Sequence, residues 1–317
     1  MIYICEPISE CKNGVQLYFN VGHSPTSAAD SPQNETTMYE LKTGFSPCPN
    51  DTFMFDALVN GDLLPKDWSL HCTIADVQEL NELTAAGQLD VSKISFGAYP
   101  AISDRYELLR TGAALGFGVG PLLVSKKTDS AFRQKLPTTP VAIPGQQTTA
   151  ALLLKLFFPE LKNTVPTLFS EIEEAVLKEK AGAGVIIHEN RFTYRDKGLK
   201  LLADLGELWE QKMEMALPLG GIAIRRDLPP AIKLQFEQAL KKSIELAFER
   251  PDDRMPYVVK YASEMDPEVM KKHIDLYVSD ESIWLSKEAR KAVITLLKQS
   301  GIEEKKNFTE DLIFLQS

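Results

Sequence analysis

The sequence is poor in cysteine and in long apolar runs, and both shortages limit what this protein can be. Four cysteines occur among 317 residues, none in a C-x-x-C pair and none beside a histidine at the spacing of a zinc site. So few thiols exclude a disulfide scaffold and favour a reduced, cytoplasmic protein. Residues 1–7 lack a basic start followed by an apolar run, so we expect no secretory signal. No stretch approaches the ~18 apolar residues of a membrane span, so we expect no membrane partner.

Positive charge is also in short supply. The chain carries 35 Lys and Arg against 44 Asp and Glu, a formal net charge of −9. Because nucleic-acid-binding proteins normally present a basic face, we expect no nucleic-acid partner. An anionic small molecule stays compatible with this balance, since local hydrogen-bond donors can outweigh a net charge. The composition, 44% hydrophobic and 25% charged, is that of a globular protein, and the length suggests two domains.

Several widespread functional motifs are missing as well. The sequence has no G-x-x-x-x-G-K-[ST] loop, no H-E-x-x-H pair and no G-x-S-x-G elbow. The glycine run at 116–121 (GFGVGP) invites a dinucleotide-binding interpretation. A strand pattern follows it, however, where that motif needs the start of a helix. A connection that uses the backbone freedom of glycine is the simpler interpretation.

The sequence does contain alternating strand and helix patterns, and this alternation occurs in both halves of the chain. The expected strands are 39–45, 69–74, 89–94, 140–143 and 185–187, and the expected helices are 52–59, 77–86, 150–158 and 171–180. The expected N-caps are Asp51, Asp76, Thr148 or Thr149, and Ser170 in a capping box with Glu173. This alternation predicts βαβ units and a mainly parallel sheet in each half.

Two strand patterns, 116–127 and 217–226, are placed to carry the chain between the halves. The C-terminal helices expected at 234–248 and 288–299 would pack back on the first half. We therefore predict a two-lobed α/β fold with a cleft. Lobe one comprises 39–126 plus 223–317, and lobe two comprises 127–222. The polar segment 1–38 is expected to be a disordered extension, with Met38 a candidate translation start.

The cleft is the expected binding site, because ligands of open α/β sheets bind beyond the carboxyl ends of strands, where helix N-termini point. The loop that holds Ser46 and Asn50 leads into one helix start, and Thr148 and Thr149 lie at the other. Hydroxyl, amide and free N–H groups of this kind could hold a carboxylate, or they could serve only as ordinary caps. A third strand of the cleft ends at Ser95.

His188 is the strongest candidate for proton chemistry. It follows the apolar run Val185–Ile187, so it stands at the carboxyl end of a strand, where α/β proteins place reactive groups. A histidine pKa of about 6.5 suits a general base near neutral pH, although a lone histidine is also a common structural residue. Glu189 could orient the ring, or it could form a surface ion pair with Arg191. The remaining histidines, His23, His71 and His273, have weaker positions.

The segments around these residues resemble the 1,4-dihydroxy-6-naphthoate synthase family of futalosine-pathway menaquinone biosynthesis. The likeness spans residues 39–317. It is carried by LKTGFSPCPNDTF at 41–53, KIS at 93–95, GVGP at 118–121, PG with TTA at 144–150, and IIHENRFTY at 186–194. The SPCPND and IIHE-x-RFTY segments separate this family from chorismate dehydratase, which shares its fold.

The resemblance implies a periplasmic-binding-protein-like (type 2) fold that works as an enzyme. The implied reaction converts cyclic dehypoxanthine futalosine to 1,4-dihydroxy-6-naphthoate and releases dihydroxyacetone, with no metal and no organic cofactor. The implied proton acceptor is His188, and the implied substrate contacts are Lys93, Ile94, Ser95, Thr149 and Ala150. One departure is Gln146-Gln147, where a basic residue is expected in many relatives, and it puts in doubt how strongly that loop binds an anion. The alternatives are a non-catalytic solute-binding protein and a chorismate dehydratase.

Overall fold

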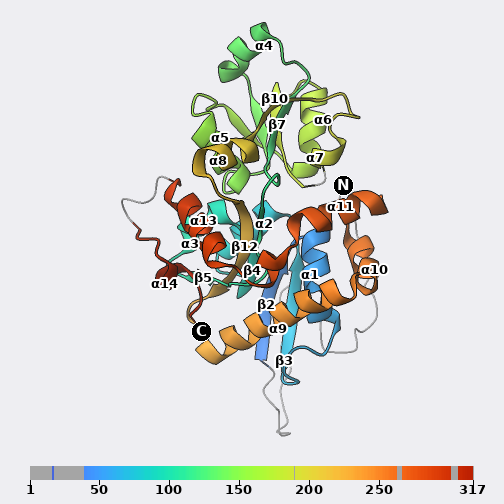
Figure 1. Cartoon of the computed structure of the whole chain (residues 1–317), viewed down its shortest axis with the longest axis vertical. Coiled ribbons are helices and arrows are strands. Elements are labelled where there is room, and N and C mark those ends of the chain that lie inside the picture. The colour runs from blue at the N-terminus through green and yellow to red at the C-terminus, as the bar shows by residue number, and fades with distance from the viewer. Residues whose placement is uncertain (1–15, 18–38, 189, 263–265, 301–305, 317) are drawn as a thin grey trace, which may run out of the picture.

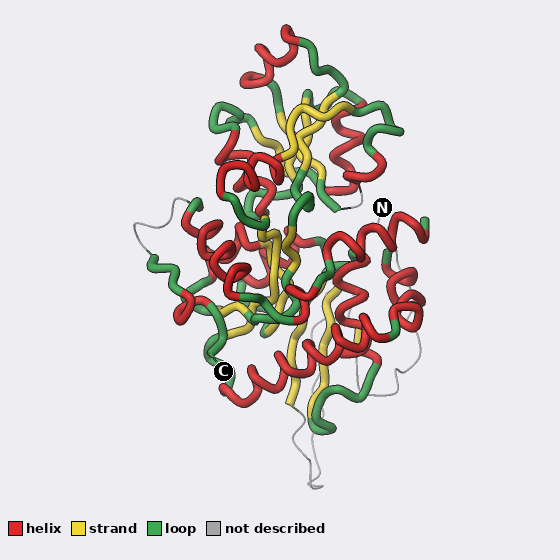
Figure 2. The backbone as a smooth tube through the Cα atoms, viewed as in Figure 1, coloured by secondary structure: helices red, strands yellow, loops and turns green. Residues whose placement is uncertain are grey.

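The protein folds into two lobes, each built around its own β-sheet (Figure 1, Figure 2). The computed structural model describes residues 16–17, 39–188, 190–262, 266–300 and 306–316. In the view of Figure 1 the five-stranded sheet lies in the upper lobe and the seven-stranded sheet in the lower one. The predicted two-lobed α/β architecture is confirmed.

The larger sheet forms lobe one and has the strand order β1-β3-β2-β4-β12-β5, with β6 pairing beside β5 on β12. Its strands are β1 (Gln16–Leu17), β2 (Tyr39–Phe45), β3 (Trp68–Ile74), β4 (Val91–Ser95), β5 (Tyr106–Leu108), β6 (Ala114–Gly116) and β12 (Leu217–Arg225). The strands that belong to βαβ units pair in parallel, whereas β12 runs antiparallel to β4, β5 and β6.

The smaller sheet forms lobe two and has the order β11-β7-β10-β8-β9. Its strands are β7 (Leu122–Ser125), β8 (Val141–Ile143), β9 (Thr164–Pro166), β10 (Ala183–Ile186) and β11 (Lys200–Asp204). Here β7 runs antiparallel to both of its neighbours, while β10, β8 and β9 are parallel. The expected parallel pairing therefore holds within the βαβ units. The strands that connect the lobes, β7 and β12, run antiparallel to their neighbours because the chain passes through each sheet in the opposite direction there.

Helices cover both sheets, and those of the C-terminal third surround lobe one, as expected (Figure 1). The helices are α1 (Pro49–Asn60), α2 (Val77–Ala85), α3 (Tyr99–Ile102), α4 (Ser130–Lys135), α5 (Thr149–Phe157), α6 (Ile172–Leu177), α7 (Asn190–Thr193), α8 (Leu205–Met213), α9 (Pro230–Glu249), α10 (Pro251–Tyr261), α11 (Pro267–Tyr277), α12 (Asp280–Ile283), α13 (Lys287–Lys298) and α14 (Glu310–Ile313). Helix α1 lies against α9, α10 and α11. Within the described residues, no helix is long and apolar enough to span a membrane.

Two of the expected helix caps are wrong. Helix α1 begins at Pro49 with Cys48 as its N-cap, which moves Asp51 into the first turn. Proline suits this position because its fixed φ is already helical and its missing N–H needs no partner. The expected capping box at Ser170 does not form, because Phe169–Glu171 is a 3₁₀ turn and α6 begins only at Ile172. The caps at Asp76 and Thr148 are confirmed.

The strand pairing also moves the expected lobe boundaries. Strand β7 lies in the sheet of lobe two, although the expected boundary at 126/127 left it in lobe one. The boundary at 222/223 falls inside β12, which pairs along its length in lobe one. Both misplacements have one cause: the strand patterns 116–127 and 217–226 do not mark the residue at which the chain leaves a sheet. The expected disordered extension, 1–38, lies outside the described residues except for β1, which pairs with β3.

The glycine run at 116–121 connects the lobes and is followed by strand β7, not by a helix. Gly118 has φ +68°, a left-handed conformation that glycine adopts without strain. Gly120 approaches Gly206 so closely that a Cβ on Gly120 would lie 2.2 Å from the Gly206 Cα. The connecting segment and the start of α8 (Leu205–Met213) therefore approach through backbone alone, which agrees with a connection between domains rather than a dinucleotide loop.

Candidate active site

A pocket lies where the two lobes meet. Its volume is about 660 Å³, which includes the part that is open to solvent. All nine residues predicted for the site line it: Ser46, Asn50, Lys93, Ile94, Ser95, Thr148, Thr149, Ala150 and His188. Both strand-loop-helix turns and both strand ends named from the sequence thus meet at one place. The lining further includes residues that were not predicted, among them Asp51, Leu219, Gly220 and Tyr277.

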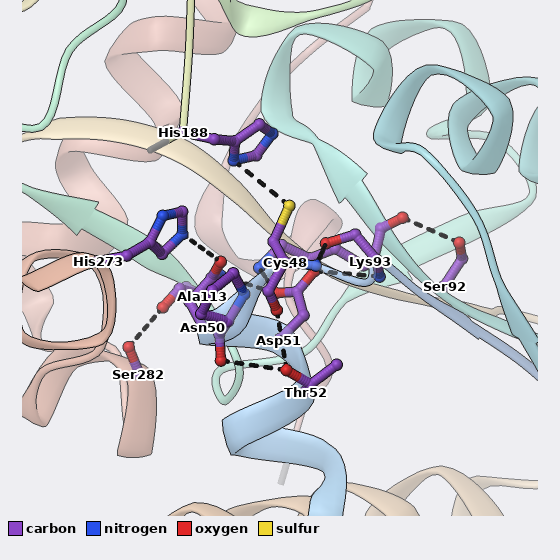
Figure 3. A network of polar contacts seen from close by, with 12 residues as sticks. Cys48, Asn50, Asp51, Thr52, Ser92, Lys93, Ala113, His188, His273 and Ser282 are labelled. Carbon is purple, nitrogen blue, oxygen red and sulfur yellow. Dashed lines mark hydrogen bonds and ion pairs between the residues drawn. The ribbon is translucent and has the colours of Figure 1, made fainter. Parts of the chain in front are cut away.

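The first turn, residues 46–51, is organised around the carboxylate of Asp51 (Figure 3). Its Oδ2 accepts hydrogen bonds from the Ser46 backbone N–H at 3.2 Å and from the Ser46 hydroxyl at 2.6 Å. Its Oδ1 accepts from Asn50 Nδ2 and from the Lys93 ammonium, both at 2.8 Å. Asp51 is 1% exposed and Lys93 is 5% exposed, so this is a buried ion pair with additional hydrogen bonds to the carboxylate. Such a fully bonded cluster holds the turn in one conformation.

The second turn, residues 144–150, carries hydroxyl groups and no charge. Thr148 caps α5 by accepting a hydrogen bond from the Ala151 N–H at 3.2 Å, and it donates to the Gly145 carbonyl. Thr149 reaches across to lobe one, where its hydroxyl donates to the Leu219 carbonyl at 2.7 Å and accepts from the Gly97 N–H at 3.1 Å. Thr149 is therefore a direct link between the lobes as well as a pocket residue.

Ser95 is the last residue of β4 and holds its backbone in place through a 3.0 Å hydrogen bond from its N–H to Asn81 Oδ1. In the described part of the chain its hydroxyl makes no hydrogen bond, which leaves it available to a ligand in the pocket. Gln146 does not line the pocket. Its amide donates to the Thr164 hydroxyl on β9 at 3.2 Å.

His188 stands just past the end of β10, as predicted, and its backbone is unusual. Its φ of +57° lies in the left-handed region that non-glycine residues rarely adopt. The ring extends from lobe two to lobe one, where Nδ1 lies 3.6 Å from the sulfur of Cys48 (Figure 3). Phe169 meets the ring edge-on, with centroids 5.1 Å apart. Glu189, expected to orient the ring, lies outside the described residues. Arg191 donates instead to the Gly120 carbonyl, in the connection between lobes.

Burial lowers the pKa of His188 from its ordinary value of 6.5 to about 4. The nearby carboxylate of Asp51 opposes this shift, whereas the Lys93 cation adds to it. The imidazole is therefore neutral at physiological pH, which is the form that accepts a proton. The same environment makes His188 a weak base. The carboxylate of Asp51 is the nearby group that favours its protonated form.

Three features of this site are not among the sequence predictions. Cys48, which contacts His188, is not predicted as a site residue. Asp51 is predicted only as a helix cap. His273, on α11, lies fully buried and contacts Asn50 through Nε2 at 2.9 Å, although 223 residues separate them in the chain. One signal could have found His273: with Met270, Ile274 and Tyr277 it forms the buried, helically spaced face of α11.

Comparison with known proteins agrees with this geometry. The sequence model of a menaquinone biosynthesis family matches residues 41–300. The chain belongs to this family. Two curated relatives are both named 1,4-dihydroxy-6-naphthoate synthase. The Streptomyces coelicolor protein is 38% identical over 268 residues, which cover 83% of this chain and 93% of the relative. The Thermus thermophilus protein is 38% identical over 265 residues, covering 83% and 94%.

Solved structures support the fold at two levels of sequence identity. An Archaeoglobus fulgidus protein is 32% identical, with a TM-score of 0.75, and the match covers 86% of this chain and 99% of that one. A Candida albicans protein described as having the generic periplasmic binding protein fold is 15% identical, with a TM-score of 0.60, and covers 86% and 93%. At that identity the likeness concerns the fold alone, and it confirms the periplasmic-binding-protein-like architecture predicted for the chain.

Proposed function

We propose that this protein is a 1,4-dihydroxy-6-naphthoate synthase that acts in the cytoplasm without a metal or organic cofactor. Its substrate would be cyclic dehypoxanthine futalosine, and its second product would be dihydroxyacetone. The observation that carries the proposal is the position of His188, just past the end of β10 in the pocket between the lobes, in a chain whose two curated relatives bear this enzyme name. A binding protein needs donors for its ligand, but it does not need an unprotonated imidazole in the pocket.

His188 would accept the proton that is removed from the sugar-derived ring of the substrate. A carbon–carbon bond then breaks, dihydroxyacetone leaves, and aromatisation of the remaining ring drives the step. If Nδ1 carries its hydrogen toward the Cys48 sulfur, the lone pair of Nε2 is available for this proton. Enclosure between two lobes excludes water and keeps the reactive carbon close to the base.

The substrate carboxylate would be held by neutral donors. The free hydroxyl of Ser95 and the N-terminus of α5, where Thr149 and Ala150 line the pocket, are the groups that offer them. Lys93 also lines the pocket, but its ammonium is bound to Asp51. We therefore assign Lys93 mainly to the electrostatics of the site rather than to direct capture of the substrate.

The direct test is to incubate the purified protein with cyclic dehypoxanthine futalosine and to detect the naphthoate and dihydroxyacetone by mass spectrometry. Chorismate serves as the matched alternative substrate. We expect product from the first compound and none from the second. Conversion of chorismate, or binding of ligand with turnover of neither compound, would contradict the proposal in favour of a chorismate dehydratase or a solute-binding protein.

The variant His188→Asn tests the role of the base. Asparagine tolerates a positive φ, so the backbone should be kept. We expect turnover to fall by about 10²–10⁴-fold, the usual contribution of a general base. Ligand binding, measured by calorimetry, should stay within about tenfold because the carboxylate donors are untouched. Turnover within about tenfold of the wild type would end the assignment of His188 as proton acceptor.

A further inference from the structure

A second histidine, His273, lies directly beside His188 without lining the pocket. Helix α11 brings it in from the C-terminal third of the chain, and none of its surface is exposed. Its ring is nearly parallel to that of His188, with centroids 5.9 Å apart and an angle of 16° between the planes. Figure 3 shows both imidazole rings beside the first turn: His188 lies next to Cys48, and His273 lies next to Asn50. A buried polar ring in such a place needs a reason beyond filling volume.

The orientation of the His273 ring is fixed through Asn50. Because Nδ2 of Asn50 donates to Asp51, the amide oxygen must point the other way, toward His273. An amide oxygen only accepts hydrogen bonds, so Nε2 of His273 must carry the hydrogen. The ring is thereby anchored to a carboxylate that Lys93 and Ser46 hold in turn. Rotation of the ring about its own bond would break this hydrogen bond.

His273 is also kept neutral. Burial lowers its pKa well below the ordinary value of 6.5, and the positive charges of His188, when protonated, and of Lys93 lower it further. A neutral ring places no positive charge against His188 when that residue accepts a proton. Tyr277, one helical turn further along α11, packs against His273 with centroids 4.6 Å apart, so the ring cannot move away from His188 without displacing a pocket residue.

We propose that His273 is a positioning residue for the proton acceptor: its flat ring, packed between Tyr277 and His188, holds the ring of His188 in the orientation needed for proton transfer. The contact crosses the cleft, since His188 comes from lobe two and His273 from lobe one. Phe169 limits the ring of His188 from the side of lobe two. The inference rests on the proposed function in one respect only, namely that His188 is the base.

A matched pair of variants separates this role from mere packing. His273→Phe keeps a flat ring and loses the hydrogen bond to Asn50, whereas His273→Gln keeps a donor for Asn50 and loses the ring. We expect the Phe variant to keep kcat within about fivefold and the Gln variant to lose more than about twentyfold, because small misplacements of a reacting group are costly. KM should change by less than about threefold in both, since neither alters a substrate contact.

The pKa of His188 gives a second measurement that needs no substrate. Carbon-13-labelled histidine allows the imidazole signals to be followed by NMR against pH, with His188→Asn used to assign the signal. The groups that face His188 are Cys48 and Asp51 near the start of α1, Lys93 on β4, and His273 and Tyr277 on α11. We expect a pKa of about 4 in the wild type and in His273→Phe. In His273→Gln it should move toward 6.5, because one face of the ring gains water.

The outcomes are decisive in both directions. A selective loss of kcat with a raised His188 pKa in the Gln variant alone supports the positioning role. Equal kcat in both variants, or a His188 pKa that is the same in both, overturns it. If the Gln variant does not fold, His273→Leu, which is apolar and has no ring plane, replaces it in the kcat comparison. Failure of the wild type to convert cyclic dehypoxanthine futalosine would sink the proposed function instead, and the NMR comparison would still test the contact between the two rings.

Discussion

The two turns that meet at the pocket have the same strand-loop-helix pattern, but different interactions hold them in place. The turn at 46–51 is charged and buried: Asp51 binds Lys93 and is saturated by hydrogen bonds from its own loop. The turn at 144–150 carries no titratable side chain and uses hydroxyls, one to cap α5 and one to bridge the lobes. The first turn therefore sets the electrostatics and geometry around His188. The second turn offers neutral donors and joins the lobes.

The largest expected effect breaks the charged turn. Asp51→Asn leaves the Lys93 ammonium buried without a counter-charge, and removal of one partner from a buried pair costs about 3–5 kcal/mol in unfolding free energy. Urea denaturation measures it. The double variant Asp51→Asn with Lys93→Met removes the stranded charge and should recover much of the loss. A cost below about 1 kcal/mol for the single variant would mean that the pair is well solvated, against the burial described.

The next effect concerns the neutral turn. Thr149→Val removes both hydrogen bonds to lobe one and leaves the Gly97 N–H and the Leu219 carbonyl without their partner. Unsatisfied buried groups cost about 1–3 kcal/mol, so we expect a loss of stability in this range and a higher KM. Urea denaturation and steady-state kinetics report the two quantities. Thr149→Ser keeps the hydroxyl and should behave like the wild type; a Ser variant as impaired as the Val variant would show that the methyl group matters instead.

The pH dependence of stability distinguishes His188, which contacts the charged turn through Cys48, from the neutral turn. The folded pKa of His188, about 4, lies below the unfolded value of 6.5, so only the unfolded chain binds this proton between those values. Stability should therefore be complete above pH 6.5 and fall by about 1.4 kcal/mol per pH unit for this group as the pH drops toward 4. His273 acts in the same direction. Urea midpoints between pH 4 and 7.5 should decline less steeply in His188→Asn than in the wild type. The loss caused by Thr149→Val should stay constant over the upper part of this range, because its turn has no group to titrate.

The smallest expected effect is that of the cap itself. Thr148→Ala removes the hydrogen bond to the Ala151 N–H, and the loss of an N-cap costs about 1 kcal/mol. Differential scanning calorimetry should show a slightly lower Tm with kcat little changed. Thr148→Ser is the matched control, since serine caps at least as well as threonine. A large fall in kcat for Thr148→Ala would show that Thr148 contributes to catalysis and not only to the cap of α5.

Local patterns in the sequence were enough for the strands and helices that form the two turns, because each depends on neighbouring residues, but not for β5, β9, β11 or α8. The pocket residues Lys93, Ile94 and Ala150 were predicted from the family resemblance alone. Alternating strands and helices placed Tyr39–Phe45 correctly to the residue, and strand ends placed Ser95 and His188 at the cleft. What the sequence could not show is pairing between distant segments. His273 meets Asn50 because the chain returns to lobe one after crossing to lobe two, and Cys48 meets His188 because the two lobes lie against each other at the pocket. The lobe boundaries shifted for a related reason, since the strand patterns of 116–127 and 217–226 do not say which sheet they join.

The left-handed backbone of His188 has a consequence for how this protein evolves. A histidine there is strained relative to glycine or asparagine, both of which adopt a positive φ more readily. If His188 is the proposed base, selection for turnover must keep a residue that selection for folding would discard. In any lineage that no longer needs the product, drift should replace this histidine early and without harm to the fold. A homologue with glycine or asparagine at this position is then best regarded as a former enzyme that keeps the fold and has lost the activity.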